Sequence, residues 1–257
     1  MESYISHGAR IGRDVQIGMA TRIHDSVEIG DGTVIGDFCS IGGPAWPDAA
    51  PTIIGPGSII RSHSVIYPDV QTGPAFETGH HTVVRSGTRA GINLRIGNFT
   101  DIEGDCEIGD YSRFHGYVHV GKGSRIGSFV WIFSLTTLAN DHLPPSHVRS
   151  PVTIEDGVVI CIGSTILPGA ILRQGAFINP GIKVRGEVPP GAVMDGDPGK
   201  MVGHVTLLVH MESRLQHPWM NHYADAYPAE AQDDLRKLLE DIRNQRPRRA
   251  AKVVGIG

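Results

Sequence analysis

ISHGAR-IGRDVQ-IGMATR-IHDSVE-IGDGTV-IGDFCS-I fills residues 5–41 and decides the fold. Each block of six begins with isoleucine, often followed by glycine, and carries a small or β-branched residue at its fifth position. After interruptions the period resumes at Ile54 and at Ile154, so that the aliphatic first position recurs as far as Val184. A fixed short period of this kind is typical of a solenoid built from stacked repeats.

The physical basis of the repeat is a triangular prism. One hexad supplies a short flat strand and a turn, three hexads make one coil, and coils stack about 4.8 Å apart. The first residue points inward, the small fifth residue fills the corner beside it, and glycine, Asn, Asp or Pro takes the turn. Cys39 and Cys106 stand at fifth positions, so we expect both in the core. The sequence therefore predicts an all-β solenoid of parallel strands.

Two excursion loops and a C-terminal appendage complete the predicted organisation. The loops are expected at residues 42–52 and 139–153 within a β-helix domain that covers residues 1–203. Residues 204–257 are expected to form a small α-helical cap and tail over the open end of the solenoid. One helix should follow Pro228 and bury the apolar residues Leu235, Leu238, Leu239 and Ile242, and another is expected near residues 205–215.

Composition excludes several classes of protein. The 257 residues carry a net charge of −4, which gives no reason to expect nucleic acid or a membrane surface as a partner. We expect no signal peptide, and no apolar run approaches the roughly 20 residues of a spanning helix. Three cysteines without a CxxC pair argue against a disulfide framework and favour a cytoplasmic location.

The repeat over residues 5–188 resembles the [LIV]-G-x-x-[STAV]-x pattern of the hexapeptide-repeat acyltransferases. The segments PPGAV at 189–193 and GDPGKMVG at 196–203 are similar to that family's closing signature, with Gly199 where alanine is usual. The resemblance implies a left-handed parallel β-helix, a homotrimer, and acetyl-CoA or another acyl-CoA as co-substrate without a metal. The hand of the helix rests on this resemblance, because periodicity alone does not determine it.

Two further segments resemble one subgroup of that family, the N-acetyltransferases of nucleotide-linked amino sugars. They are TGHHTVVR at 78–85, with His81 in place of the usual Asn, and LAND at 138–141 followed by Pro144. The implied function is acyl transfer to an amino group of a dTDP- or UDP-linked sugar. Histidine suits general-base work near neutral pH. The catalytic candidates are His80, His142 and His115, and the candidate substrate contacts are His81, Arg85, His119, Asn140 and Asp141.

The expected donor site lies on the last coils. Lys183, Arg185 and Lys200 are candidate partners for the phosphates of acyl-CoA, because charge-assisted hydrogen bonds are strong. Backbone groups around Gly163, Ala176, Pro180 and Gly181 are candidates for holding the pantetheine arm.

Three alternatives remain open at this point. His142 stands in the loop where sugar O-acetyltransferases carry a general base, so a hydroxyl acceptor competes with an amine. Zinc-dependent γ-type carbonic anhydrases share the prism, but they need two histidines five positions apart, and His115 and His119 are four apart. A non-catalytic β-helix scaffold subunit is the third alternative, which the closing signature disfavours.

Overall fold

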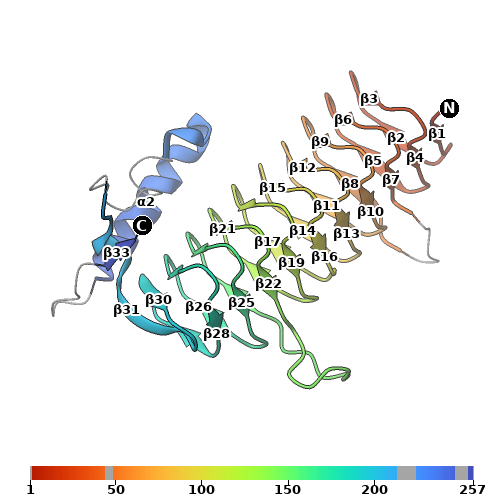
Figure 1. Ribbon diagram of the computed structural model, residues 1–257. Helices are drawn as coiled ribbons and strands as arrows, with labels where there is room; N and C mark the ends of the chain where they lie inside the picture. Colours follow the sequence, from red (N-terminus) through yellow and green to blue (C-terminus); the bar gives the residue numbers. More distant parts are fainter. Residues whose placement is uncertain (1, 44–48, 213–223, 247–253, 257) are drawn as a thin grey trace.

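The computed structural model describes residues 2–43, 49–212, 224–246 and 254–256. The chain forms a left-handed parallel β-helix whose coils stack along one axis, followed by a small C-terminal segment with one α-helix (Figure 1). The predicted fold class is confirmed. Residues 44–48, which include Trp46 of the first predicted loop, lie outside the described residues, as do residues 247–253 of the tail.

Three parallel sheets make the faces of the prism, named here A, B and C. Sheet A contains β1 (Tyr4–Ile5), β4 (Arg22–Ile23), β7 (Ser40–Ile41), β10 (Val65–Ile66), β13 (Val83–Val84), β16 (Asp101–Ile102), β19 (His119–Val120), β22 (Thr137–Leu138), β25 (Thr165–Ile166) and β28 (Lys183–Val184). Sheet B contains β2 (Arg10–Ile11), β5 (Val27–Ile29), β8 (Thr52–Ile54), β11 (Gln71–Thr72), β14 (Arg89–Ala90), β17 (Glu107–Ile108), β20 (Arg125–Ile126), β23 (Thr153–Ile154), β26 (Ile171–Leu172) and β29 (Glu187–Val188). Sheet C contains β3 (Gln16–Ile17), β6 (Val34–Ile35), β9 (Ile59–Ile60), β12 (Glu77–Thr78), β15 (Arg95–Ile96), β18 (Arg113–Phe114), β21 (Trp131–Ile132), β24 (Val159–Ile160), β27 (Phe177–Ile178), β30 (Ala192–Asp195) and the antiparallel β31 (Lys200–His204).

Hexad position determines where each side chain points. Each of β1 to β28 ends on the inward first-position residue that the sequence predicts, and such residues as Ile23 and Ile66 are fully buried. The fifth-position residues Cys39 and Cys106 are buried as expected. The residue that precedes the inward one points away from the core. Outward side chains 18 positions apart along an uninterrupted stretch therefore lie side by side on adjacent coils.

The three corners of the prism differ in what covers them. Both excursion loops leave the corner between sheets A and B, since one joins β7 to β8 and the other joins β22 to β23. The corner between sheets B and C is covered by α2 (Gln232–Asn244), whose Leu238 and Ile242 approach Gly157 and Gly175. The corner between sheets C and A carries an exposed ladder of stacked rings. Its members are Phe38, His63, His81, Phe99 and Tyr117, with centroids 4.6 to 5.0 Å apart.

The C-terminal segment differs from its prediction in two respects. Where a helix is predicted near residues 205–215, the described part forms the 3-10 turn η1 (Val205–Leu207) and the strand β32 (Leu208–His210), which pairs with β33 (Val254–Ile256). This departure fits the β-branched and apolar run VTLLV, which suits an extended chain. The helix after Pro228 is confirmed, beginning with η3 (Ala229–Ala231) after the short turn η2 (Ala224–Ala226).

The position of α2 is the second difference. Its four predicted apolar residues are buried in one cluster with Tyr111 and Phe129, so that the helix follows four successive coils along an edge of the prism. The sequence predicts a helical cap over the open end, but there β31 covers the last parallel strand of sheet C. No helix in the described part of the chain is both long and apolar enough to cross a membrane.

Candidate active site

The outer face of sheet A carries a cluster of charged side chains around His119. Asp101 and His119 are register partners on adjacent strands, because they are 18 positions apart. His119 Nδ1 lies 3.4 Å from Asp101 Oδ2, and His119 Nε2 lies 3.9 Å from Glu103 Oε1. Arg85, from the preceding coil, pairs with Asp101 at 3.3 Å. The fold thus brings His119 and Arg85, two predicted substrate contacts, together with two carboxylates.

These neighbours change the acid–base properties of His119. The hydrogen bond with Asp101 is the largest influence and raises the pKa of His119 above its usual 6.5, against the opposing effect of burial. The same hydrogen bond holds the pKa of Asp101 below its usual range. The imidazole is half-buried, with 38% of its side chain exposed. His119 is therefore a base that is oriented through Nδ1 and whose side chain is partly exposed.

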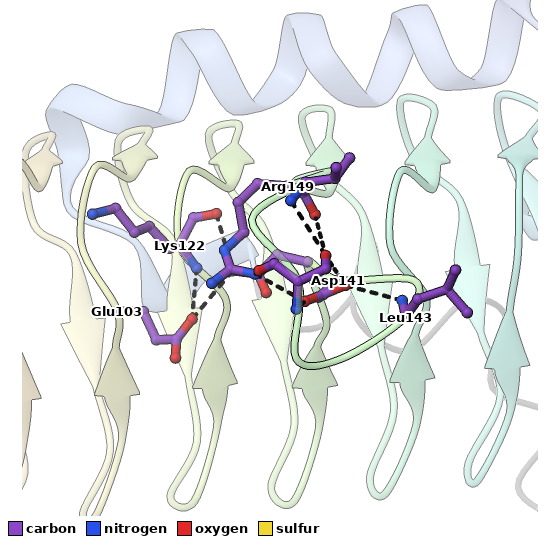
Figure 2. A network of polar contacts seen from close by, with 8 residues as sticks. Glu103, Lys122, Asp141, Leu143 and Arg149 are labelled. Carbon is purple, nitrogen blue, oxygen red and sulfur yellow. Dashed lines mark hydrogen bonds and ion pairs between the residues drawn. The ribbon is translucent and has the colours of Figure 1, made fainter.

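The loop at 139–153 reaches the same cluster through Asn140. The Asn140 Nδ2 group donates to Glu103 Oε2 at 3.2 Å, and the backbone N–H of Lys122 donates to the same oxygen at 2.9 Å. In Figure 2, Glu103 lies beside Lys122 next to the loop that contains Asp141. Asn140, a predicted substrate contact, thus holds a carboxylate in place.

Asp141, a predicted substrate contact, makes its hydrogen bonds within its own loop. Its carboxylate accepts hydrogen bonds from the Leu143 and Ser146 N–H groups and pairs with Arg149 at 2.9 Å (Figure 2). The Ser146 hydroxyl contributes most to lowering the pKa of Asp141. Only 10% of its side chain is exposed, because these contacts surround it. Asp141 therefore stabilises the conformation of the loop at 139–153 through contacts within that loop.

The other candidate histidines lie apart from this cluster in the fold. His80 and His81 lie in the turn between sheets C and A, where the His80 ring is 2.8 Å from the Ser62 hydroxyl and the His81 ring stacks on Phe99. His142 lies in the loop that follows β22, with its Nε2 directed at Gly169, where an added Cβ would lie 3.7 Å from it. The structure therefore does not gather the predicted histidines into one site.

His115 lies on sheet C, around the corner from His119. Its ring packs against Phe133 and Trp131, and burial lowers its pKa below 6.5. A hollow of about 490 Å³ borders it, lined in part by Arg95 and Arg113. Burial lowers the pKa of Arg113 to about 10, and its guanidinium lies over the Tyr227 ring. This face is aromatic and cationic, whereas the face around His119 is rich in carboxylates.

The predicted donor residues fall mostly at one corner. Gly163, Pro180 and Gly181 lie in turns between sheets C and A, and a Cβ added at either glycine would meet no atom within 4 Å. Lys183 follows on β28, and its carbonyl accepts from the N–H of Gly199, the neighbour of Lys200, at 3.3 Å. The exposed Arg185 follows β28.

Ala176 does not belong with these residues. It occupies a small inward fifth position at the opposite corner, beside α2, and is fully buried. Its backbone N–H donates to the Arg173 carbonyl at 3.1 Å, and its carbonyl accepts from the Val159 N–H at 2.9 Å. The structure therefore separates Ala176 from the other candidate donor residues, and a contribution of its backbone to the donor site stays a prediction.

Sequence reasoning missed Asp101, Glu103 and the main-chain N–H of Lys122. The available signal was spacing, because Asp101 stands 18 positions before His119 and Glu103 stands 18 positions after Arg85. The same interval separates His63 from His81, whose rings stack at 4.6 Å. Within the described residues, no three His, Cys, Asp or Glu side chains are placed to hold a metal ion.

Known proteins share the repeat and the fold. The family model for the bacterial transferase hexapeptide (six repeats) matches residues 8–43. The chain is 29% identical over 186 residues to the bifunctional protein GlmU of Mycolicibacterium smegmatis, a match that covers 70% of this chain and 36% of GlmU. It is 27% identical over 163 residues to the mitochondrial gamma carbonic anhydrase 2 of Arabidopsis thaliana, covering 62% of this chain and 52% of that protein.

A solved structure matches nearly the whole chain. The Arabidopsis UDP-N-acetylglucosamine acyltransferase superposes with a TM-score of 0.69 at 19% identity, covering 95% of this chain and 90% of that one. At that identity the match concerns the fold. The chain spans only about a third to a half of the two curated relatives above. The predicted resemblance to the hexapeptide-repeat proteins is confirmed in repeat and in fold.

Proposed function

We propose that this hexapeptide-repeat protein is an acyltransferase that moves an acetyl or other acyl group from acyl-CoA to an amino group of a nucleotide-linked sugar. The observation that carries the proposal is His119, with Asp101 beside Nδ1 and a partly exposed side chain. The hexapeptide transferase repeat and the shared fold of a UDP-N-acetylglucosamine acyltransferase support the reaction class. His119 takes the role of general base in place of His80, His142 or His115.

The proposed chemistry is proton removal followed by attack on a thioester. Asp101 accepts the Nδ1–H of His119, so that Nε2 is free to take a proton from the acceptor. The acceptor nitrogen then bonds to the thioester carbonyl carbon, and the tetrahedral intermediate collapses as the C–S bond breaks. The thiolate leaves and takes up the proton carried by His119, which restores the neutral imidazole. The acylated nitrogen loses its remaining extra proton to solvent.

The donor fits along the corner between sheets C and A. From β19 to β28 the order of sheet A is β19, β22, β25 and β28, a span of about 14 Å at three strand spacings. An extended pantetheine arm would cross this span from phosphates near Lys183, Arg185 and Lys200 to the thioester beside His119. The open turns at Gly163, Pro180 and Gly181 would line its path.

A hydroxyl acceptor is the second candidate, favoured by the His119–Asp101 pair itself. A sugar ammonium loses its proton near neutral pH, whereas a hydroxyl starts near water's pKa of roughly 15.7 and needs a well-oriented base. An orienting carboxylate beside the histidine is the arrangement that such a base requires. O-acylation of a sugar is therefore the main competitor to N-acylation.

We further propose a homotrimer assembled through the corner between sheets C and A. The other two corners carry the excursion loops and α2, whereas this one presents exposed apolar side chains. Phe38, Phe99, Tyr117 and Leu135 are each between 45% and 59% exposed. Light scattering should give three times the 27.7 kDa of one chain, and a stable monomer at micromolar concentration would refute the trimer. The free cysteines are in keeping with a cytoplasmic enzyme.

Free-thiol release from acetyl-CoA tests the function directly. The purified protein is mixed with UDP- and dTDP-linked amino sugars and with their hydroxyl counterparts, and product mass identifies the acylated atom. Amine-dependent release that His119→Gln abolishes supports the proposal, and hydroxyl-dependent release supports the second candidate. If no acceptor releases thiol, the zinc-loaded protein is assayed for CO₂ hydration, which tests the carbonic anhydrase alternative. Inactivity in both assays would favour the scaffold role.

A further inference from the structure

Glu103 has one oxygen fixed by the protein and one facing His119. Glu103 Oε2 accepts from the Lys122 N–H at 2.9 Å and from Asn140 Nδ2 at 3.2 Å. Glu103 Oε1 lies 3.9 Å from His119 Nε2, which is too long for a hydrogen bond. About 30% of the Glu103 side chain and 38% of the His119 side chain are exposed, so both residues are partly open to solvent.

The carboxylates next to Glu103 have cationic partners among the described residues. Asp101 pairs with Arg85 at 3.3 Å, and Asp105 pairs with Lys122 Nζ at 3.0 Å. Among the ion pairs of the described residues, Glu103 has only the long approach of His119. Its two hydrogen bonds come from neutral donors, a main-chain N–H and a side-chain amide. A carboxylate positioned in this way is able to receive a cation from a ligand.

We propose that Glu103 determines specificity by binding the ammonium group of the acceptor beside His119 Nε2. The inference rests on the proposed acyl transfer and narrows its substrate class to a sugar amine that arrives protonated. The ammonium places one N–H on Glu103 Oε1 and another on His119 Nε2. The latter proton passes to the imidazole, and the freed lone pair attacks the thioester carbonyl. As the C–S bond breaks, the thiolate takes the proton from His119 and the nitrogen releases a second proton to solvent. A neutral hydroxyl gains much less from the Glu103 charge.

Asn140 acts in this scheme as a positioning residue. Its amide fixes the Glu103 side chain from the loop at 139–153, so the loop helps to define the acceptor pocket without touching the reacting atoms. Asn140→Ala should raise the KM of an amine acceptor less than Glu103→Gln does, and it should leave kcat nearly unchanged.

The test compares Glu103→Gln with wild type, using UDP-glucosamine and UDP-glucose as probes that differ in one amine. Glutamine keeps an oxygen for the Lys122 and Asn140 donors but removes the charge. The control is Glu107→Gln on sheet B, where the exposed Glu107 pairs with Arg125. Dissociation constants from calorimetry give a readout that does not require turnover, and thermal melting verifies that each variant is folded.

We expect wild type to bind UDP-glucosamine more tightly than UDP-glucose. Glu103→Gln should weaken the affinity for UDP-glucosamine about tenfold and leave the affinity for UDP-glucose unchanged. The wild-type preference should also weaken as pH rises and the ammonium deprotonates, whereas the variant should show no such trend. Equal preferences in wild type and Glu103→Gln would overturn the assignment of Glu103. If wild type transfers acyl groups but the preference does not depend on Glu103, the proposed function stands and this inference fails. Absence of acyl transfer alongside a Glu103-dependent amine preference would instead refute the function alone.

Discussion

His115 and His119 are four residues apart in the chain, yet they lie on two faces of the prism with opposite chemistry. His119 is on sheet A beside Asp101 and Glu103, and its pKa is raised. His115 follows β18 of sheet C against Trp131 and Phe133, and its pKa is lowered. In this fold, a histidine's environment depends on its position in the hexad and on which residues stand 18 positions away.

The largest expected difference between the two faces is catalytic. His119→Gln should lower kcat by about 10²-fold or more, the usual contribution of a general base. His115→Gln should change kcat by less than about threefold, since its ring faces aromatic side chains on another sheet. The measurement is steady-state thiol release with saturating acyl-CoA and acceptor. The reverse ranking would move the base to sheet C and refute the assignment of the site.

The second prediction tests Asp101, the carboxylate beside His119 that has no counterpart beside His115 among the described residues. The hydrogen bond that Asp101 accepts from His119 is the main reason that the pKa of His119 is raised, so Asp101→Asn should lower that pKa. The acid limb of the pH–rate profile should move to lower pH, and the plateau kcat should fall on the order of tenfold as the ring loses its orientation. Asp31→Asn, which removes an ion pair with Arg13, is the matched control. An unmoved acid limb would show that Asp101 does not set the acid–base behaviour.

A smaller effect is expected at the donor end of the prism. Lys200→Glu should raise the KM for acyl-CoA by about three- to tenfold, because it replaces a candidate phosphate partner with a like charge. The KM for the acceptor should stay the same, since the acceptor binds on sheet A. Lys237→Glu on the exposed side of α2 serves as the control. An acyl-CoA KM equal to that of the control would remove Lys200 from the donor site.

The fold was largely predictable because the hexad places a buried residue at fixed intervals. The strands from β1 to β28 end at the positions that the pattern indicates. The site was less predictable, because its groups come from three coils and a loop, and the aliphatic pattern carries no information about outward residues. Asp101 was recoverable from its spacing to His119, but the contact of Asn140 with Glu103 depends on the path of an irregular loop.

The last prediction concerns the stability of the two faces against pH, and it has opposite signs for the two histidines. The folded-state pKa of His119 is raised, so its contribution to stability is full below pH 6.5 and is lost as pH rises through the folded pKa. The folded-state pKa of His115 is lowered, so protonation favours the unfolded chain as pH falls from 6.5 through the folded pKa. Between pH 8 and 5, the Tm of His119→Gln should therefore fall more than that of wild type, and the Tm of His115→Gln should fall less. Each difference should be about 1 °C, because both rings are partly exposed and solvent screens their interactions. Scanning calorimetry of the three proteins across this range checks the signs, and parallel curves would show that the two faces do not differ in their protonation equilibria.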